Sequence, residues 1–217
     1  MTQRHRNQLD IYDPEIDWQK SVLIVWAWWI WSTTTYALAQ MGIIDITVID
    51  FDELENHNIA TQFYREDQLW KWKLKSLKEN VKQFTWVEIK TIEWLFKAEY
   101  VEWMDIVIMW VDNMKTRKEI AEACESSNVS RLIDCRMKAE FFVIYNFIPQ
   151  YELDLYLQKR YSDDEADEEK CTLKWVSYNC LWIASILARI VKWIIKEEKH
   201  ILDKFELWVD LHNLQIT

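Results

Sequence analysis

Two series of polar residues in this 217-residue chain have types and spacings that could do chemistry. The first series reads D-x-D-x(5)-N-x(3)-Q-x(10)-K, and the second is an Asp-Asn pair with an arginine one helical turn later. Carboxylates accept hydrogen bonds from hydroxyl groups, amides donate and accept, and a lysine is a point charge for phosphate. The residues are Asp50, Asp52, Asn58, Gln62 and Lys73, followed by Asp112, Asn113 and Arg117.

The segment WAWWIW, residues 26–31, separates the first predicted strand from the first predicted helix. Taken literally, four indoles at such a turn make poor physical sense, because the run invites aggregation. With glycine in place of tryptophan it becomes GAGGIG, which matches G-x-G-x-x-G in the context that the motif requires. Glycines there permit a tight turn and close approach of backbone N–H groups to phosphate. The predicted phosphate loop comprises Trp26, Trp28, Trp29 and Trp31, and Asp50 follows at the usual spacing for a ribose-binding acid.

The amino-acid composition favours the same substitution. The chain has 1 glycine, Gly42, and 15 tryptophans. Average glycine usage of about 7% predicts about 15 glycines in a chain of this length, so the two counts together match the expected number. Our hypothesis is that most tryptophans stand where UGA codons are read as glycine. Indoles in the phosphate loop would fill the phosphate site, so the function is read from the glycine-containing sequence.

Alternating strands and helices position this loop. Buried strands are predicted at the start of residues 22–31 and over 46–52, 86–92, 104–109, 131–136 and 140–149. Helices are predicted over 32–41, 73–84 and 116–127, the first ending at Gly42, where a left-handed C-cap is favoured. This order predicts an α/β fold, a Rossmann-like doubly wound, mainly parallel sheet with helices on both faces and ligands at the carboxyl ends of its strands.

The pattern changes after residue 149. A short helix is predicted over 151–160, an acidic loop over 161–170, a long apolar helix over 176–196 and a final strand within 205–216. No internal repeat and no Pro/Gly/Ser linker divides the chain. We therefore expect a single nucleotide-binding domain over 1–217, with residues 1–20 as an N-terminal arm.

The overall composition disfavours several classes of protein. A net charge of -10 argues against a broad basic face for nucleic acid or anionic lipid. The longest apolar stretches are about ten residues, which is short for a bilayer, and no signal peptide is recognised at the start. The cysteines, Cys124, Cys135, Cys171 and Cys180, include no C-x-x-C pair. We therefore expect neither a structural zinc site nor a disulfide framework, and a cytoplasmic location.

With glycine restored, the chain resembles the ThiF/MoeB family, the adenylating domain of ubiquitin-activating enzymes and their bacterial relatives. The resemblance runs from about residue 4 to 196 and is strongest in VLIVWAWWIWS, VIDFDELENHNIATQ, LWKWK and VDNMKTR. Tryptophan also stands at three later family glycines, whose positions were not used to propose the recoding. The glycine form of the chain is defined here by glycine at seven positions: Trp26, Trp28, Trp29, Trp31, Trp70, Trp175 and Trp182.

The resemblance implies ATP-dependent adenylation of a carboxylate, usually the C-terminus of a ubiquitin-like or sulfur-carrier protein. It assigns the ribose to Asp50, the phosphates to Lys73 and Mg²⁺ to Asp112. Asp52, Asn58 and Gln62 are expected to help order the nucleotide. Attack of the carboxylate on the α-phosphorus then gives an acyl-adenylate and pyrophosphate, through positioning and charge stabilisation.

Each of these residues also has a purely structural alternative. Asp50 and Asp52 can cap the next segment, and Asp112 can cap the following helix. Lys73 can be one of several solvated lysines, and Arg117 is expected to tie its helix to the strand ends. Three cysteines are expected to be buried thiols, and four histidines form no metal or triad pattern: Cys124, Cys135 and Cys180; His5, His57, His200 and His212.

Two arginines of the family pattern need replacements in this chain. The family commonly has an arginine three residues after the asparagine, where this chain has Thr61, and Arg65 one turn later is the candidate substitute. A second family arginine reaches from the N-terminal arm into the partner subunit's site. Arg4 or Arg6 could serve, which implies a homodimer; the alternative is a basic terminus without this role.

A covalent step is a further expectation. Cys171 begins CTLK, which resembles the surroundings of the catalytic cysteine in ubiquitin-activating enzymes, and it follows the acidic loop. A thiolate there could take the acyl group from the adenylate as a thioester. Many bacterial relatives keep a cysteine at this place without that role, so both readings stay open.

Three other functions compete with adenylation of a protein C-terminus. One is an NAD(P)-dependent oxidoreductase on a similar phosphate loop, which the series from Asn58 to Lys73 and the Asp112-Asn113 pair disfavour. Another is adenylation of an RNA-borne carboxylate, which the net charge disfavours. The third is a non-catalytic scaffold subunit, which Thr61 and the short chain favour.

Overall fold

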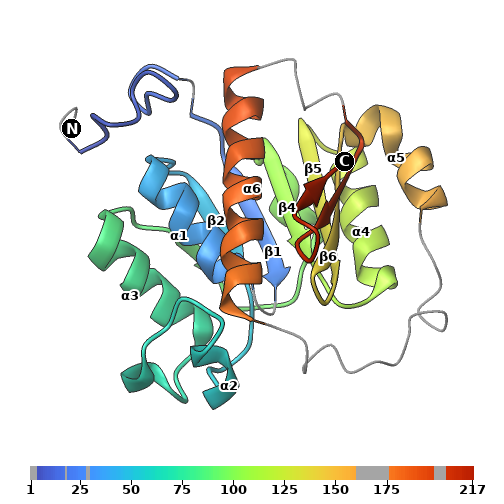
Figure 1. Ribbon diagram of the computed structural model, residues 1–217. Helices are drawn as coiled ribbons and strands as arrows, with labels where there is room; N and C mark the ends of the chain where they lie inside the picture. Colours follow the sequence, from blue (N-terminus) through green and yellow to red (C-terminus); the bar gives the residue numbers. More distant parts are fainter. Residues whose placement is uncertain (1–3, 18, 28–29, 160–175, 198–203) are drawn as a thin grey trace.

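A single eight-stranded sheet organises the protein in the computed structural model, which describes residues 4–17, 19–27, 30–159, 176–197 and 204–217 (Figure 1). The strand order is β3-β2-β1-β4-β5-β6-β7-β8. The first five strands in this order pair in parallel and the last three pair antiparallel. The strands are β1 (Val22–Ala27), β2 (Ile46–Ile49), β3 (Lys90–Ile92), β4 (Ile106–Trp110), β5 (Arg131–Lys138), β6 (Phe141–Phe147), β7 (Glu206–Asp210) and β8 (Gln215–Ile216).

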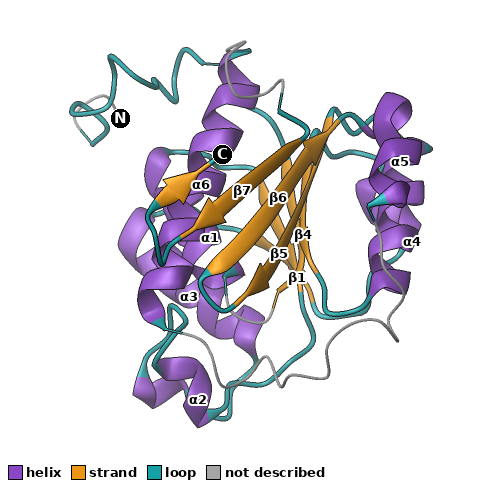
Figure 2. Ribbon diagram, turned by 45° about the vertical axis from the view of Figure 1, so that its right-hand side comes forward, coloured by secondary structure: helices purple, strands orange, loops and turns teal. Residues whose placement is uncertain are grey.

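Helices cover both faces of the sheet, as expected for a doubly wound fold (Figures 1 and 2). Helices α1, α3 and α6 lie on one face, over a core of residues such as Ile24 and Leu187, and α4 and α5 lie on the other, over residues such as Leu23 and Tyr156. The helices are α1 (Trp31–Met41), α2 (Asn56–Ile59), α3 (Lys73–Thr85), α4 (Met114–Glu125), α5 (Pro149–Gln158) and α6 (Ser177–Lys196), with 3₁₀ turns η1 (Glu66–Gln68) and η2 (Ala98–Val101).

The sequence predicted most of these elements, but it missed the short helix α2 and differed from the structure in three strands. β2 ends at Ile49, so Asp50 and Asp52 lie in the loop beyond it rather than in the strand. β3 covers only the last three residues of its predicted range, because Val87 and Ile89 are buried outside the sheet and their alternation imitates a strand. The single final strand is instead the hairpin β7–β8.

Six described residues adopt the left-handed backbone region that favours glycine: Gly42, Trp70, Trp86, Ala139, Glu197 and Leu214. Gly42 has φ 101 and ends α1, as predicted, and a Cβ there would lie 2.7 Å from Cβ of Pro14. Trp70 has φ 66 and Trp86 has φ 70, and their side chains are 70% and 76% exposed. Both tryptophans therefore combine a backbone suited to glycine with an indole that gains little from burial.

Helix α6 is the one described helix long and apolar enough, by length and composition, to cross a bilayer. Its most apolar window has a mean hydropathy of 1.4, and 61% of that window is buried against the rest of the protein. Arg189 and Lys192 interrupt the apolar sequence of this helix, in line with the expectation of uninterrupted apolar stretches of about ten residues. Its burial is that of a core helix.

Candidate functional site

The predicted site residues follow strands that meet in the middle of the sheet. β1 pairs with β2 on one side and with β4 on the other, so the strand order reverses direction there. Ligands of open α/β sheets bind at the carboxyl edge at such a switch point. Asp50 follows β2, the loop over 26–31 follows β1 and Asp112 follows β4. The fold therefore brings the two polar series and the predicted phosphate loop to one edge.

Asp50 is a buried acid with one unused oxygen. The residue is 1% exposed, and its Oδ1 accepts a hydrogen bond of 2.8 Å from the backbone N–H of Asp52. Its Oδ2 is buried without a hydrogen-bond partner. Burial raises the pKa of Asp50 to about 6, opposed by the nearby Lys73 and reinforced by Asp52. Local capping thus accounts for one oxygen of this carboxylate and leaves the other for a ligand.

Lys73 is held beside Asp50 by Asp52. Its Nζ lies 2.7 Å from Oδ2 of Asp52, and its backbone N–H donates to the Asp52 carbonyl at 2.9 Å. Lys73 is 5% exposed, whereas Lys71 and Lys75 are exposed. The alternative of a solvated lysine is therefore wrong, and Lys73 places a buried positive charge next to the acids.

The segment after α2 packs on the start of α1. The backbone N–H of Phe63 donates to Oγ of Ser32 at 3.0 Å, and the ring of Tyr64 meets the indole of Trp31 edge to face, with centroids 6.1 Å apart. Gln62 is 7% exposed, and neither its amide nitrogen nor its amide oxygen has a partner. Asn58 uses its amide oxygen to accept from the Glu55 N–H at 2.8 Å, within the first turn of α2.

Buried polar atoms without partners gather in this region. Of the fourteen such side-chain atoms in the described part of the chain, eight belong to the first two turns of α1 or to residues 50–64. A buried polar group left unpaired costs about 1–3 kcal/mol, so native proteins normally satisfy it. Such a cluster therefore indicates a polar ligand. The atoms are Trp31 Nε1, Thr34 Oγ1, Thr35 Oγ1, Asp50 Oδ2, Thr61 Oγ1, Gln62 Nε2 and Oε1, and Tyr64 Oη.

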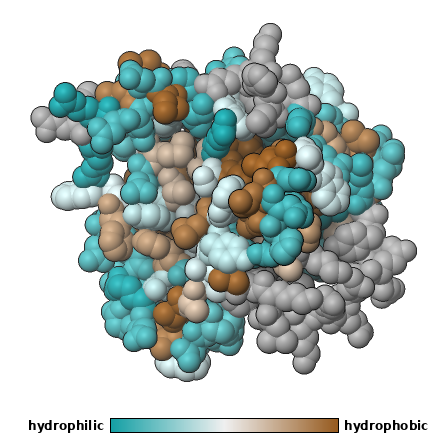
Figure 3. Space-filling view, in the orientation of Figure 1, coloured by the Kyte–Doolittle hydropathy of each residue, from teal (hydrophilic) through white to brown (hydrophobic). Residues whose placement is uncertain are grey.

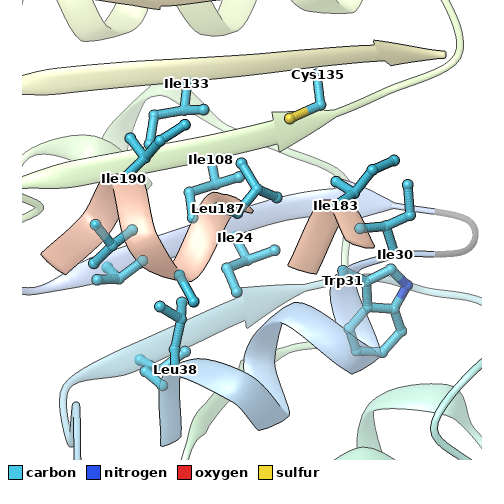
Figure 4. Packing of buried hydrophobic residues seen from close by; sticks show 14 of the residues in the cluster. Ile24, Ile30, Trp31, Leu38, Ile108, Ile133, Cys135, Ile183, Leu187 and Ile190 are labelled. Carbon is cyan, nitrogen blue, oxygen red and sulfur yellow. The ribbon is translucent and has the colours of Figure 1, made fainter. Parts of the chain in front are cut away.

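Trp31 fills the space that a small residue would leave at the start of α1. The residue is 2% exposed and packs in the cluster of Ile24, Ile108 and Leu187 between the sheet and α6 (Figure 4). The gap beside it has a volume of about 10 Å³, room for one water at most. Residues 28 and 29 lie outside the described residues, as does the side chain of Trp26. The polar groups around Trp31 thus suit a nucleotide, whereas its indole does not.

Asp112 is exposed two residues beyond β4 and does not cap α4. The cap is Asn113, whose Oδ1 accepts from the Thr116 N–H at 2.7 Å and whose Nδ2 donates to Asp112 Oδ1 at 3.0 Å. The capping alternative for Asp112 is therefore wrong, and its carboxylate is exposed in the loop that follows β4. Among the described residues, no group of three or more His, Cys, Asp or Glu forms a metal cluster.

Arg117 anchors the loop that carries Asp112. Its guanidinium donates to the carbonyls of Val111 and Cys135 and pairs with Asp134, which confirms that it ties α4 to the strand ends. Asp134 is 0% exposed and also accepts from Nε of Arg136 at 2.8 Å and from the Tyr156 hydroxyl at 2.9 Å. Sequence reasoning missed this cluster, since its members come from three elements.

Arg65, the predicted substitute for the family arginine, makes contacts with its own segment and with α3. Its Nε lies 2.9 Å from Asp67 Oδ1 and its Nη1 lies 2.5 Å from Asn80 Oδ1. These bonds hold the loop between α2 and α3 against α3. A phosphate contact by Arg65 stays a prediction.

The N-terminal arm lies at the opposite, amino edge of the sheet. Nη1 of Arg4 donates to the Thr85 carbonyl at 2.6 Å, and the guanidinium lies 5.2 Å from the ring of Trp86. A cavity of about 990 Å³ opens there between the arm and the ends of α1 and α3. Arg4 is thus far from the site of its own chain, and its predicted role in a partner's site stays a prediction.

The predicted cysteines divide into two groups. Cys124, Cys135 and Cys180 are buried thiols, as expected, and burial raises the pKa of Cys180 to about 12. Cys171 and the acidic loop over 161–170 lie outside the described residues. The thioester proposal therefore rests on the sequence.

Comparison with known proteins gives a consistent result. Residues 19–215 match the ThiF family. Similar solved structures include PaaA, with a TM-score of 0.73 and 16% identity, where the match covers 100% of this chain and 81% of PaaA. They also include E. coli MccB with ATP, with a TM-score of 0.73 and 16% identity, where the match covers 94% of this chain and 64% of MccB. A third is the microcin C7 biosynthetic enzyme MccB with N-formylated MccA, with a TM-score of 0.73 and 18% identity, where the match covers 91% of this chain and 63% of that enzyme.

Two limits apply to these similarities. This chain spans less than two thirds of the MccB chains, and identities of 16–18% show the fold alone. No curated protein matches the chain.

Proposed function

The chain belongs to the ThiF family, and on that basis we propose that its glycine form adenylates a carboxylate with ATP. The observation that carries the proposal is the set of buried polar atoms without partners at the carboxyl edge, beside the Lys73–Asp52 ion pair. A nucleotide supplies the hydroxyl and phosphate groups that these atoms lack. The likeness to MccB, which is known with ATP bound, supports the same ligand.

Each site residue has a task in this reaction. Asp50 Oδ2 accepts a hydrogen bond from the ribose, and the loop over 26–31 with the N–H groups at the start of α1 receives the phosphates. Lys73 offsets their charge. Asp112 is the residue that would hold Mg²⁺, which supplies charge neutralisation on the phosphate oxygens. The acceptor carboxylate attacks the α-phosphorus, and its oxygen forms the acyl-adenylate as pyrophosphate leaves.

We propose that the acceptor is the C-terminus of a protein or peptide, such as a ubiquitin-like or sulfur-carrier protein. MccB is known in complex with MccA, which supports a separate polypeptide partner. Exposed apolar side chains near the start of α6 and on the C-terminal hairpin, such as Leu181 and Leu214, offer contact area for it. Figure 3 shows apolar surface gathered over this part of the face. A homodimer with Arg4 or Arg6 in the partner's site, a thioester on Cys171 and a cytoplasmic location complete the proposal.

Analysis of the products separates adenylation from the alternatives. The glycine form is incubated with Mg-ATP and either a ubiquitin-like protein or a peptide that has a free C-terminal carboxylate. Adenylation gives pyrophosphate and an acyl-adenylate, which hydroxylamine converts to a hydroxamate and AMP. A C-terminal amide is the matched control and gives none of these. Formation of ADP and phosphate, or reduction of NAD(P) with no nucleotide cleavage, would contradict the proposal, and ATP binding without turnover would favour a scaffold.

A further inference from the structure

Tyr64 is a buried tyrosine whose hydroxyl the fold leaves unused. The residue is 8% exposed, and its Oη has no hydrogen-bond partner. Burial and the nearby carboxylates of Asp50 and Asp52 raise its pKa well above the ordinary value, so the hydroxyl keeps its proton and can donate. A buried phenol normally finds a partner for its hydroxyl, so this one lacks a group that the protein does not supply.

The neighbours of Tyr64 define what that group can be. Asp50, whose Oδ2 is likewise unpartnered, and Asp52 are close enough to act on the Tyr64 hydroxyl electrostatically. The ring packs edge to face on the indole of Trp31, which stands at the third glycine position of the predicted G-x-G-x-x-G motif. Two carboxylates make this corner unfavourable for a phosphate, because like charges repel at short range. A neutral group that can both donate and accept hydrogen bonds suits it.

We propose that Tyr64 determines selectivity for the sugar, by donating a hydrogen bond to a ribose hydroxyl that itself donates to Asp50 Oδ2. A hydroxyl has one proton for the carboxylate and lone pairs for the phenol, so a single group satisfies both orphaned atoms. A deoxyribose that lacks this hydroxyl leaves both unpaired. The proposal rests on the proposed function for the identity of the nucleotide and goes beyond it in assigning Tyr64.

Binding of ATP, 2′-deoxy-ATP and 3′-deoxy-ATP tests the assignment by calorimetry. The glycine form and its Tyr64→Phe variant are compared, with Tyr12→Phe as a matched control. Tyr12 is a second buried tyrosine, whose hydroxyl is hydrogen-bonded to Gln19 near the N-terminal arm. Tyr64→Phe is expected to lower the affinity for ATP about five- to tenfold, which corresponds to the loss of one net hydrogen bond. It is expected to leave unchanged the affinity for the analogue that lacks the bonded hydroxyl, and Tyr12→Phe to change none of the three.

Three outcomes overturn the assignment, and a fourth separates it from the proposed function. If Tyr64→Phe lowered the affinity for all three nucleotides equally, Tyr64 would act on Asp50 and not on the sugar. Unchanged affinities in Tyr64→Phe would show that water or nothing meets the hydroxyl. ATP binding with the expected pattern, but without pyrophosphate exchange, would contradict adenylation and leave the sugar assignment standing. Absence of ATP binding by the glycine form would overturn both.

Discussion

At the scale of single residues, Asp50 links stability to pH. Its folded pKa of about 6 lies above the ordinary value of 3.8, because burial disfavours the charged carboxylate. A raised folded pKa means that the folded state binds the proton more tightly than the unfolded chain. The associated stability is therefore fully present below about pH 4 and is lost as the pH rises through about 6.

We expect the free energy of unfolding to fall by about 2 kcal/mol between pH 4 and pH 7 from this residue alone. Asp50→Asn keeps an oxygen for the Asp52 N–H and removes the titration, so this part of the pH dependence should disappear. Urea unfolding across that range measures it. The exposed Asp154→Asn is the control, and an Asp50→Asn profile parallel to that of the parent would contradict the burial argument.

The residue scale also shows what the sequence can reveal about the site. Asp50 was predicted from its spacing after the phosphate loop, and Lys73 and Asp112 were predicted from the resemblance to the ThiF/MoeB family. Tyr64 and Asp134 were not found. Tyr64 matters because the fold buries its hydroxyl beside Asp50. Asp134 matters because three elements place hydrogen-bond donors around it. Spacing along the chain carries no signal for either.

At the scale of elements, the two turns that flank α3 are strained because they carry tryptophan where the backbone favours glycine. Trp70 lies three residues before the start of α3 and Trp86 ends this helix, both with positive φ. Trp70→Gly and Trp86→Gly should each raise the free energy of unfolding by about 1 kcal/mol, since glycine adopts this backbone at no steric cost. Thermal unfolding measures the gain.

The matched control for these turns is Trp103→Gly. Trp103 is 83% exposed and is not among the residues with positive φ, so no gain is expected from it. A gain of the same size at Trp103 would show that any exposed indole destabilises the chain. The backbone explanation would then be wrong.

A second element-scale prediction concerns the attachment of α4 to β5. Asp134 is fully buried and pairs with Arg117 and Arg136. Asp134→Asn leaves two buried guanidinium groups without a counter-charge, and a broken buried pair costs about 3–5 kcal/mol. Urea unfolding should show a loss of this size, against less than about 0.5 kcal/mol for Glu122→Gln in the exposed pair with Lys118. A loss below 1 kcal/mol at Asp134 would contradict the anchoring role.

Element prediction from the sequence succeeded where the period was unambiguous. Helix α3 and helix α6 were located within one or two residues, and Gly42 marked the end of α1. The edge strand β3 was overextended because packing under α3 buries Val87 and Ile89 at the strand period. The short helix α2 was missed, since four residues show no periodicity.

At the scale of the whole molecule, the two edges of the sheet differ. The carboxyl edge collects the acids, Lys73 and the unpartnered polar atoms, whereas the larger cavity lies at the amino edge beside the N-terminal arm. In the described part of the carboxyl edge, Trp31 is buried and leaves a gap of only about 10 Å³ beside it. Polar groups suited to a nucleotide and an indole that obstructs it are best reconciled by glycine at that position.

The central claim is that this carboxyl edge adenylates a carboxylate, and ATP–pyrophosphate exchange tests it most directly. With Mg-ATP and a carrier that has a free C-terminus, the glycine form should exchange labelled pyrophosphate into ATP. Lys73→Met should lower the rate at least about 100-fold, because it removes a charge aimed at the transition state, while Lys75→Met leaves it unchanged. The chain with tryptophan in the loop should show no exchange. Exchange by the tryptophan chain at the same rate, or none by the glycine form with bound ATP and carrier, would contradict the claim.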